Sequence, residues 1–316
     1  MARLSGRVLG MVCLPSLMLG TAVGVARYSP PSRPQIRQAA AASAQMQPAV
    51  ATVNPLLAHS RKVLLQQAQV SFAAFSGGVS SEKEVALTFD DGPDPEVTPQ
   101  ILDILKQERV PATFFVVGSK AERFPELILR EAEEGHDFGN HTFHHFELTN
   151  LDPAGVRAEI TRTNDALEQI VGAKTRWFRA PGCHYTPDAL KVIRNCGMVR
   201  VDTQDNSGDW ANPGVPSILR RTLSHLSPGD VILCHDRIPQ TVEALPRLIH
   251  TLRKRGYRIV PLAQLALEAQ STPGFRPVIW PRGEGVQIQA IRPRLRNNPL
   301  VPKTLLRNRP QASRSA

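Results

Sequence analysis

Two adjacent carboxylates and a later group of histidines are the residues of this sequence best suited to chemistry. Asp90 and Asp91 follow an apolar, β-branched run at 85–89 and precede a Gly-Pro turn. Residues 139–145, GNHTFHH, contain three histidines. Carboxylate and imidazole together form the ligand set of catalytic zinc sites, where three protein ligands leave a position open for water. If one carboxylate binds metal, its neighbour can accept a proton, so the pattern indicates metal-assisted hydrolysis.

Alternating strand and helix patterns must position these residues. The predicted strands are 85–89, 112–117, 137–140, 176–180, 198–203, 230–235 and 257–260. The predicted helices are 97–108, 121–134, 153–171, 187–195, 215–225 and 240–254. Repeated βα units predict a parallel sheet. Polar motifs follow the strands at their C-terminal ends, which favours an α/β barrel over an open sheet.

The sequence also predicts how the rest of the chain is organised. Residues 1–26 have an export pattern, with Arg3 and Arg7 before an apolar run of 19 residues. Because a membrane span needs ~20 residues, a cleaved signal peptide and an uncleaved signal anchor both stay open. The remaining segments are predicted as follows: a linker at 27–54, a helix (55–75) and linker within 55–83, a catalytic domain at 84–268, and a flexible basic Pro/Arg-rich tail at 269–316 with one short strand pattern at 286–291.

Positive charge is concentrated at the two ends of the chain. Residues 1–50 carry +5 and residues 271–316 carry +8, so residues 51–270 carry −3 of the total of +10. A nucleic-acid enzyme would carry its positive charge around the site, so no nucleic-acid partner is expected. Basic ends on an acidic body suit an anionic wall or membrane surface, and solvated tails with no partner are the alternative.

The four cysteines form no CxxC pair, which excludes a structural zinc ribbon. Cys13 lies in the N-terminal apolar run. Cys183, Cys196 and Cys234 allow at most one internal disulfide, and three buried free thiols are the simpler expectation.

Five motifs occur in an order that resembles the polysaccharide deacetylase family, the NodB-type carbohydrate esterases. They are TFDDG at 88–92, HTxxH at 141–145, FRAPG at 178–182, DW at 209–210 and LCH at 233–235. The resemblance covers roughly residues 84–265. It implies a distorted (β/α)7 barrel of the polysaccharide deacetylase type, which agrees with the strand and helix pattern.

The resemblance implies that Asp91, His141 and His145 bind one divalent metal ion. The i, i+4 spacing of the two histidines would place both imidazoles on one face of a helical turn. His144 is three residues from His141 and could lie on the same face, but the motif favours His145. Zn²⁺ is the default ion, and Co²⁺, Ni²⁺ or Mn²⁺ would accept the same ligands.

The resemblance also assigns acid and base roles. Asp90 becomes the general base, and Arg179 pairs with it, orients it and holds its pKa down. His235 becomes the general acid, and Asp209 pairs with it and keeps it protonated. Asp205 lies close to Asp209 in the sequence and is the alternative partner of His235.

Four residues are expected to bind substrate. The backbone N–H of Gly182 would donate to the oxyanion. Family members often carry an aromatic residue there, so glycine is a departure that could widen the groove, and Tyr185 could substitute. The resemblance implies that Leu233 and Trp210 wall the pocket for the acetyl methyl group, and Trp210 could instead stack on a sugar.

These residues predict an exported, monomeric hydrolase that removes N-acetyl groups from a cell-envelope or extracellular polysaccharide, peptidoglycan or chitin-like. Periplasm, envelope and secretion all fit export, with or without a membrane anchor. An O-acetyl esterase of the xylan type is an alternative, because the motifs do not separate amide from ester. A glycoside hydrolase would need two carboxylates but no histidine pair. A non-catalytic wall-binding protein with this fold is the alternative from another class.

Overall fold

The computed structural model of this chain describes residues 66–77, 80–203, 205–273 and 275. The predicted export segment, the linker after it and nearly all of the basic tail, including its strand pattern, lie outside the described residues. Within the described part, no helix is both long and apolar enough to cross a membrane.

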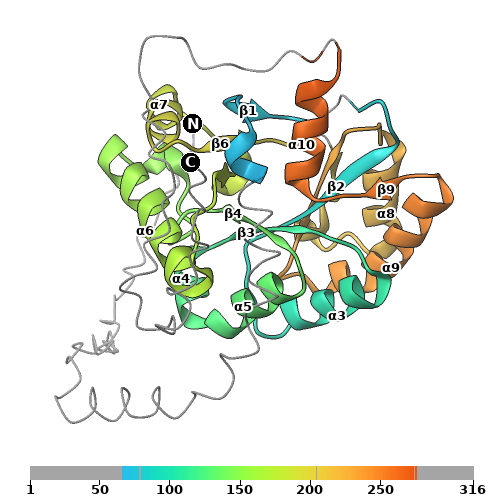
Figure 1. Ribbon diagram of the computed structural model, residues 1–316. Helices are drawn as coiled ribbons and strands as arrows, with labels where there is room; N and C mark the ends of the chain where they lie inside the picture. The colour runs from blue at the N-terminus through green and yellow to red at the C-terminus, as the bar shows by residue number, and fades with distance from the viewer. Residues whose placement is uncertain (1–65, 78–79, 204, 274, 276–316) are drawn as a thin grey trace, which may run out of the picture. The chain divides into compact units, whose positions relative to one another are not determined.

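One parallel sheet forms the centre of the molecule, with helices packed around it (Figure 1). The strands are β1 (Ala74–Phe75), β2 (Glu84–Asp90), β3 (Thr113–Val116), β4 (Asp137–Asn140), β5 (Trp177–Phe178), β6 (Val199–Val201), β7 (Asp205–Asn206), β8 (Val231–His235) and β9 (Arg258–Ile259). Their order is β1-β6-β5-β4-β3-β2-β8-β7, and β9 pairs with the start of β2. Among the described residues no pairing joins β1 to β7, so the barrel is open, and the predicted distorted (β/α)7 fold is confirmed.

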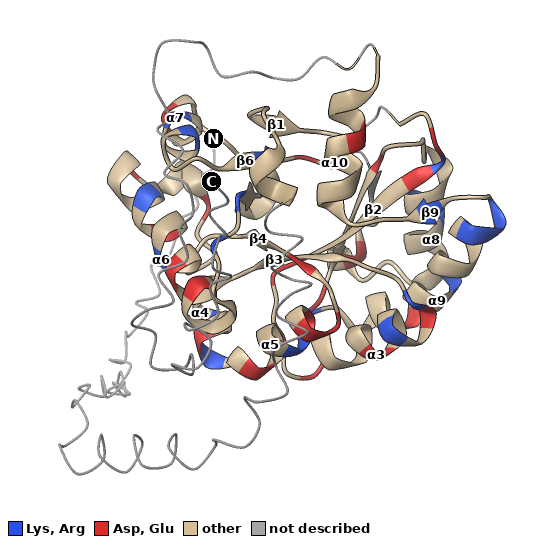
Figure 2. Cartoon of the chain, in the orientation of Figure 1, with Lys and Arg blue, Asp and Glu red and all other residues tan. Residues whose placement is uncertain are grey.

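The helices lie in the connections between strands. They are α3 (Thr98–Glu108), α4 (Gly118–Arg123), α5 (Pro125–Glu133), α6 (Pro153–Val171), α7 (Pro187–Asn195), α8 (Val215–Ser224), α9 (Pro239–Lys254) and α10 (Leu262–Ser271). Local signals set the ends of α6: the Asp152 side chain accepts a hydrogen bond from Gly155 N at 2.7 Å, and Gly172 ends the helix with φ 77°. Lys, Arg, Asp and Glu residues lie on these outer helices and also in the loops and strands (Figure 2).

Besides the two-residue strand β7, which was not predicted, three elements differ from the prediction. The helix predicted at 121–134 is two helices, because Pro125 lacks an N–H and begins a new helix after Phe124. Residues 74–75 form a strand paired with β6 instead of the end of a helix, since a short buried apolar run suits either structure. The third, α10, was not predicted, and it begins after Pro261 without a side-chain cap.

Strand β2 lies inside the sheet and carries the paired carboxylates at its C-terminal end. All seven of its residues are buried, as expected for a strand covered on both faces. Its Asp90 is in register with Phe115 of β3 and with His235 of β8. The parallel arrangement therefore brings the ends of β2, β4, β5 and β8 to one edge of the sheet.

Candidate active site

The turn after β2 positions two carboxylates differently. Asp90 ends the strand, while Asp91 has φ 78°, in the left-handed region that a residue other than glycine seldom adopts. Two contacts hold the turn: Lys120 Nζ donates to Asp91 O at 2.6 Å, and Val117 N donates to Gly92 O at 2.9 Å. Backbone conformations of this kind cluster at functional sites because the surrounding structure must fix them.

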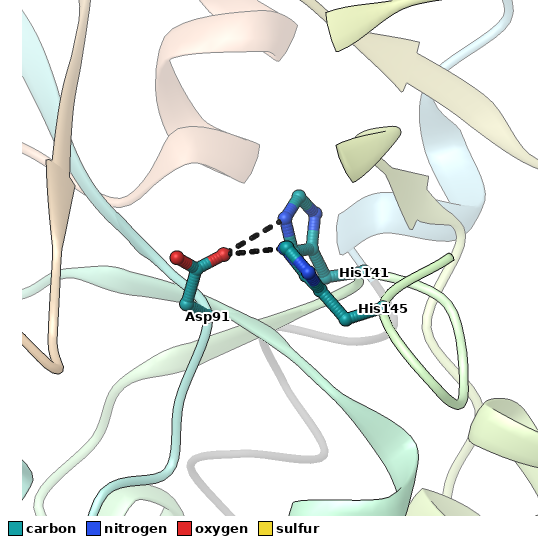
Figure 3. A group of neighbouring side chains, drawn as sticks. All are labelled: Asp91, His141 and His145. Atoms are coloured by element: carbon teal, nitrogen blue, oxygen red, sulfur yellow. Dashed lines mark ion pairs between the residues drawn. The ribbon is translucent and has the colours of Figure 1, made fainter. Parts of the chain in front are cut away.

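Asp91, His141 and His145 meet in one group, as the motifs predicted (Figure 3). One ligand atom from each residue lies within 4.8 Å of the other two. Asp91 Oδ1 is 2.8 Å from His145 Nε2 and 3.3 Å from His141 Nε2. His141 Nδ1 lies 2.8 Å from the carbonyl oxygen of Arg179, which fixes the ring with Nε2 toward Asp91.

The chemistry of this donor set fits a divalent cation. Burial would raise the pKa of Asp91, but hydrogen bonds from His141, His145 and Arg237 outweigh it and hold the pKa below the ordinary value. The carboxylate is therefore ionised and lies beside two imidazole nitrogens, the set that zinc prefers. Asp91 and His141 are buried and His145 is exposed, so the group is open on one side.

The loop that carries the histidines is not helical, which corrects the predicted helical turn. Thr142 and His145 have φ values of 66° and 61°, so the two imidazoles converge through loop geometry instead of helix periodicity. His144 lies apart from the group, with Nδ1 2.7 Å from Glu159 Oε1. The other oxygen of Glu159 accepts hydrogen bonds from Phe143 N at 2.8 Å and His144 N at 2.7 Å.

Glu159 was not singled out from the sequence. It is buried on the face of α6 that also buries Val156, Ile160 and Thr163. An acidic residue on the buried face of a helix pattern is the signal that could have identified it.

Asp90 forms a buried ion pair with Arg179. Arg179 Nη1 donates to Asp90 Oδ1 at 2.6 Å and to Thr88 Oγ1 at 3.0 Å. Its Nε donates to Val201 O at 3.2 Å, and the guanidinium lies 4.0 Å above the centre of the Phe115 ring. The contacts with Thr88, Val201 and Phe115 therefore fix the guanidinium that orients Asp90. The other oxygen of Asp90, Oδ2, is 4.0 Å from His141 Nε2.

His235 and Asp209 form the second buried pair. Asp209 Oδ1 is 2.7 Å from His235 Nδ1, and Oδ2 accepts from His235 N at 2.8 Å and from Thr241 Oγ1. Burial lowers the pKa of His235, but the hydrogen bond and charge of Asp209 raise it above the ordinary value overall. Burial raises the pKa of Asp209, whereas its bonds to His235 lower it overall. The side chain of Asp205, the alternative partner, is not among those described.

The predicted substrate residues lie around these pairs. Gly182, with φ 65°, sits in the 3-10 turn η3 (Pro181–Cys183), where a side chain would be strained. Leu233 is buried in β8, and Trp210 is 57% exposed in the turn η4 (Asp209–Ala211). Tyr185 is half-buried, and its hydroxyl accepts a hydrogen bond from Ala180 N at 3.1 Å.

Arg237 also reaches the site and was not singled out from the sequence. Its Nε donates to Asp91 Oδ2 at 2.6 Å, so this oxygen is paired while Oδ1 faces the two histidines. Its position two residues after His235 was the available signal.

The described cysteines are free. Cys183 is exposed, Cys196 is half-buried and Cys234 is buried. The expectation of free thiols is confirmed for these three, but of the three only Cys234 is buried as expected. Cys13 lies outside the described residues.

Known proteins are similar to this chain in sequence and in fold. The polysaccharide deacetylase family profile matches residues 77–201. A chitooligosaccharide deacetylase of Bradyrhizobium sp. is 41% identical over 204 residues, covering 60% of this chain and 93% of that protein. A peptidoglycan-N-acetylglucosamine deacetylase of Bacillus cereus is 37% identical over 191 residues, covering 59% and 89%.

Solved structures agree with these matches. A crystal structure of a peptidoglycan N-acetylglucosamine deacetylase is similar with TM-score 0.59 and 36% identity, covering 61% of this chain and 92% of that one. A CE4 family pseudoenzyme from Bacillus anthracis is similar with TM-score 0.59 and 27% identity, covering 63% and 70%. The motifs, the open barrel and these matches agree: the chain belongs to the polysaccharide deacetylase family.

Proposed function

We propose that this protein hydrolyses the N-acetyl groups of an N-acetylglucosamine-containing polysaccharide of the cell envelope, releasing acetate and leaving a free amine. The observation that carries the proposal is the convergence of three side-chain groups at one sheet edge: the Asp91–His141–His145 group, the Asp90–Arg179 pair and the His235–Asp209 pair. The relatives named as chitooligosaccharide and peptidoglycan deacetylases support the substrate class.

Asp91, His141 and His145 would hold one divalent ion, for which zinc is the first candidate. When bound, such an ion polarises a carbonyl oxygen and lowers the pKa of water. Arg237 and the backbone contacts of Asp91 orient the carboxylate for this role. Zinc is the first candidate because one ionised carboxylate and two imidazoles are ligands that suit zinc.

The chain's own residues would divide the proton transfers. Asp90, oriented by Arg179, accepts a proton from the attacking water. His235, kept protonated by Asp209, donates a proton to the departing amine nitrogen. The Gly182 N–H donates to the oxyanion, and Leu233 and Trp210 enclose the acetyl methyl group.

The cellular setting is part of the same proposal. The export pattern of residues 1–26 supports a location outside the cytoplasm, in the periplasm, at the envelope or secreted. The basic ends suit an anionic wall or membrane surface, where the polysaccharide also lies.

The test is acetate release from N-acetylated and O-acetylated glycans, measured in parallel with metal-stripped and zinc-resupplied protein. Release from N-acetyl sugars alone, restored by zinc, would support the proposal. Release from esters alone would overturn the amide substrate. Metal binding without release from either would favour a non-catalytic protein, the class of the similar pseudoenzyme.

A further inference from the structure

Two large hydrophobic side chains are exposed within the described part of the chain, and each directly follows a residue of the site in the sequence. Trp210 is 57% exposed and follows Asp209, the partner of His235. Phe146 is 50% exposed and follows His145 of the metal-binding group. Single exposed hydrophobic residues are common, but two aromatic rings at one site indicate a ligand surface.

The strands that precede these two residues lie on opposite sides of β2, which carries the carboxylates. Phe146 follows β4 and Trp210 follows β7, and the strand order β4-β3-β2-β8-β7 sets β2 between them. Four strand spacings of ~4.8 Å separate β4 from β7 by roughly 19 Å along the edge. A ligand that follows this curved edge from β4 to β7 passes the C-terminal end of β2, as a polysaccharide chain could.

The Phe146 ring is held in place by His144, which is itself held by Glu159 and Arg162. Its ring stacks on His144 with centroids 5.1 Å apart and an interplanar angle of 21°. Glu159 holds His144 through Oε1 at 2.7 Å, and Arg162 Nη1 lies 3.4 Å from the other ring nitrogen of His144. The exposed ring is thus positioned before a ligand arrives, which lowers the entropy cost of binding.

The loop of Phe146 also borders the turn that carries the proposed oxyanion donor. A Cβ built on Gly182 would lie 4.0 Å from Glu147 Oε1, so the residue after Phe146 approaches this turn. Gly182 offers no side chain to a sugar, and the Tyr185 hydroxyl is bonded to the backbone. On this side of the site, Phe146 is the exposed large aromatic residue among those described.

We infer that Phe146 is a stacking platform for a sugar ring next to the N-acetylated unit, forming a glycan subsite that extends the site on the β4 side. The inference rests on the proposed function for the identity of the ligand. Apolar faces of pyranose rings pack on aromatic rings, whereas hydroxyl groups remain solvated at the edge.

The experiment compares Phe146→Ala, Phe146→Leu and Phe146→Trp with the parent on N-acetylglucosamine oligomers of increasing length. Leucine keeps an apolar side chain without the ring, and tryptophan restores a ring. We expect Ala and Leu to raise KM for the longest oligomer about fivefold to tenfold, with the shortest unaffected and Trp close to the parent. Zinc content and Tm should not change.

Binding measured by calorimetry in an Asp90→Asn background separates this inference from the proposed function. If no oligomer is deacetylated but binding still weakens with Phe146→Ala and Phe146→Leu, the reaction is wrong and the subsite stands. If Phe146→Ala binds the long oligomer as tightly as the Asp90→Asn protein with Phe146 intact, the subsite is overturned. Full binding by Phe146→Leu overturns ring stacking, and no binding by the parent overturns the glycan ligand.

Discussion

At the scale of single residues, the site depends on which polar atoms face each other. Asp90 and Asp91 are neighbours in sequence, yet one pairs with Arg179 and the other with two imidazoles. The left-handed backbone at Asp91 separates them, since it turns the second carboxylate away from the strand direction. One fixed turn therefore gives two neighbouring carboxylates different partners.

The His235–Asp209 pair predicts a pH dependence. Because the pKa of His235 is raised, its protonated form persists to higher pH than in an ordinary histidine, and acid-dependent activity falls as pH rises through that pKa. Asp209→Asn removes the main cause of the raised pKa, so the basic limb of kcat/KM should move to lower pH.

A pH profile of kcat/KM for the parent and Asp209→Asn measures this shift. We also expect kcat to fall by at least about tenfold, because a neutral partner stabilises the imidazolium less. An unmoved basic limb would show that His235 is not the titrating acid.

Two adjacent histidines provide a matched test of the metal-binding group. His145→Ala should lower zinc affinity by about tenfold or more, because it removes one of three ligands. His144→Ala should retain zinc, since His144 faces Glu159 and not Asp91. Zinc stoichiometry after dialysis against a chelator distinguishes the two variants, and equal loss from both would contradict this ligand set.

At the scale of elements, α6 fixes the loop after β4. Glu159 on α6 accepts hydrogen bonds from the backbone N–H groups of Phe143 and His144. This loop has no repeating hydrogen-bond pattern of its own, so the helix supplies the partners that a strand or helix would otherwise provide. The helix therefore acts on the Asp91–His141–His145 group through the loop that carries the two histidines.

Glu159→Ala should release this loop. One buried and one partly buried N–H group would lose their partner, which should lower the free energy of unfolding by about 2–3 kcal/mol. Zinc affinity should fall by about tenfold or more, because the loop that carries His145 loses its support. Urea unfolding and zinc titration measure the two effects. A variant that loses stability but binds zinc as the parent does would confine Glu159 to a structural role.

Strand patterns and motif order are local, so they predicted seven of the nine described strands and the motif residues at strand ends. Sequence reasoning missed the split at Phe124 and the strand at 74–75, which depend on a proline break and on pairing with β6. It also missed Glu159 and Arg237, whose partners lie 16 and 146 residues away in the sequence. Such contacts exist only after the chain has folded.

At the scale of the whole molecule, an enzyme body with a small negative charge lies between strongly basic ends. The protein is a polysaccharide deacetylase by sequence and fold, and its matched relatives are named for acetylated oligosaccharides and peptidoglycan. This charge division suggests that catalysis and surface attachment belong to different parts of the chain.

Deletion of residues 276–316 tests that division. These residues contain nine Lys and Arg and one Glu, so their loss should weaken binding to anionic wall material, most clearly at low salt. Deacetylation of short soluble oligomers should remain within about twofold of the parent, because the proposed site residues all lie outside this segment. Co-sedimentation at two salt concentrations, with acetate release alongside, measures both effects. Unchanged sedimentation would contradict attachment through the tail.

Acetate release by zinc-loaded Asp90→Asn tests most directly whether Asp90 is the base of a metal-dependent deacetylase. Asparagine keeps an oxygen for Arg179 and leaves Asp91, His141 and His145 intact. We expect Asp90→Asn to retain zinc while its rate of acetate release falls about 10²- to 10⁴-fold. A zinc-loaded variant that releases acetate from N-acetylglucosamine oligomers at the parent rate would contradict this role of Asp90.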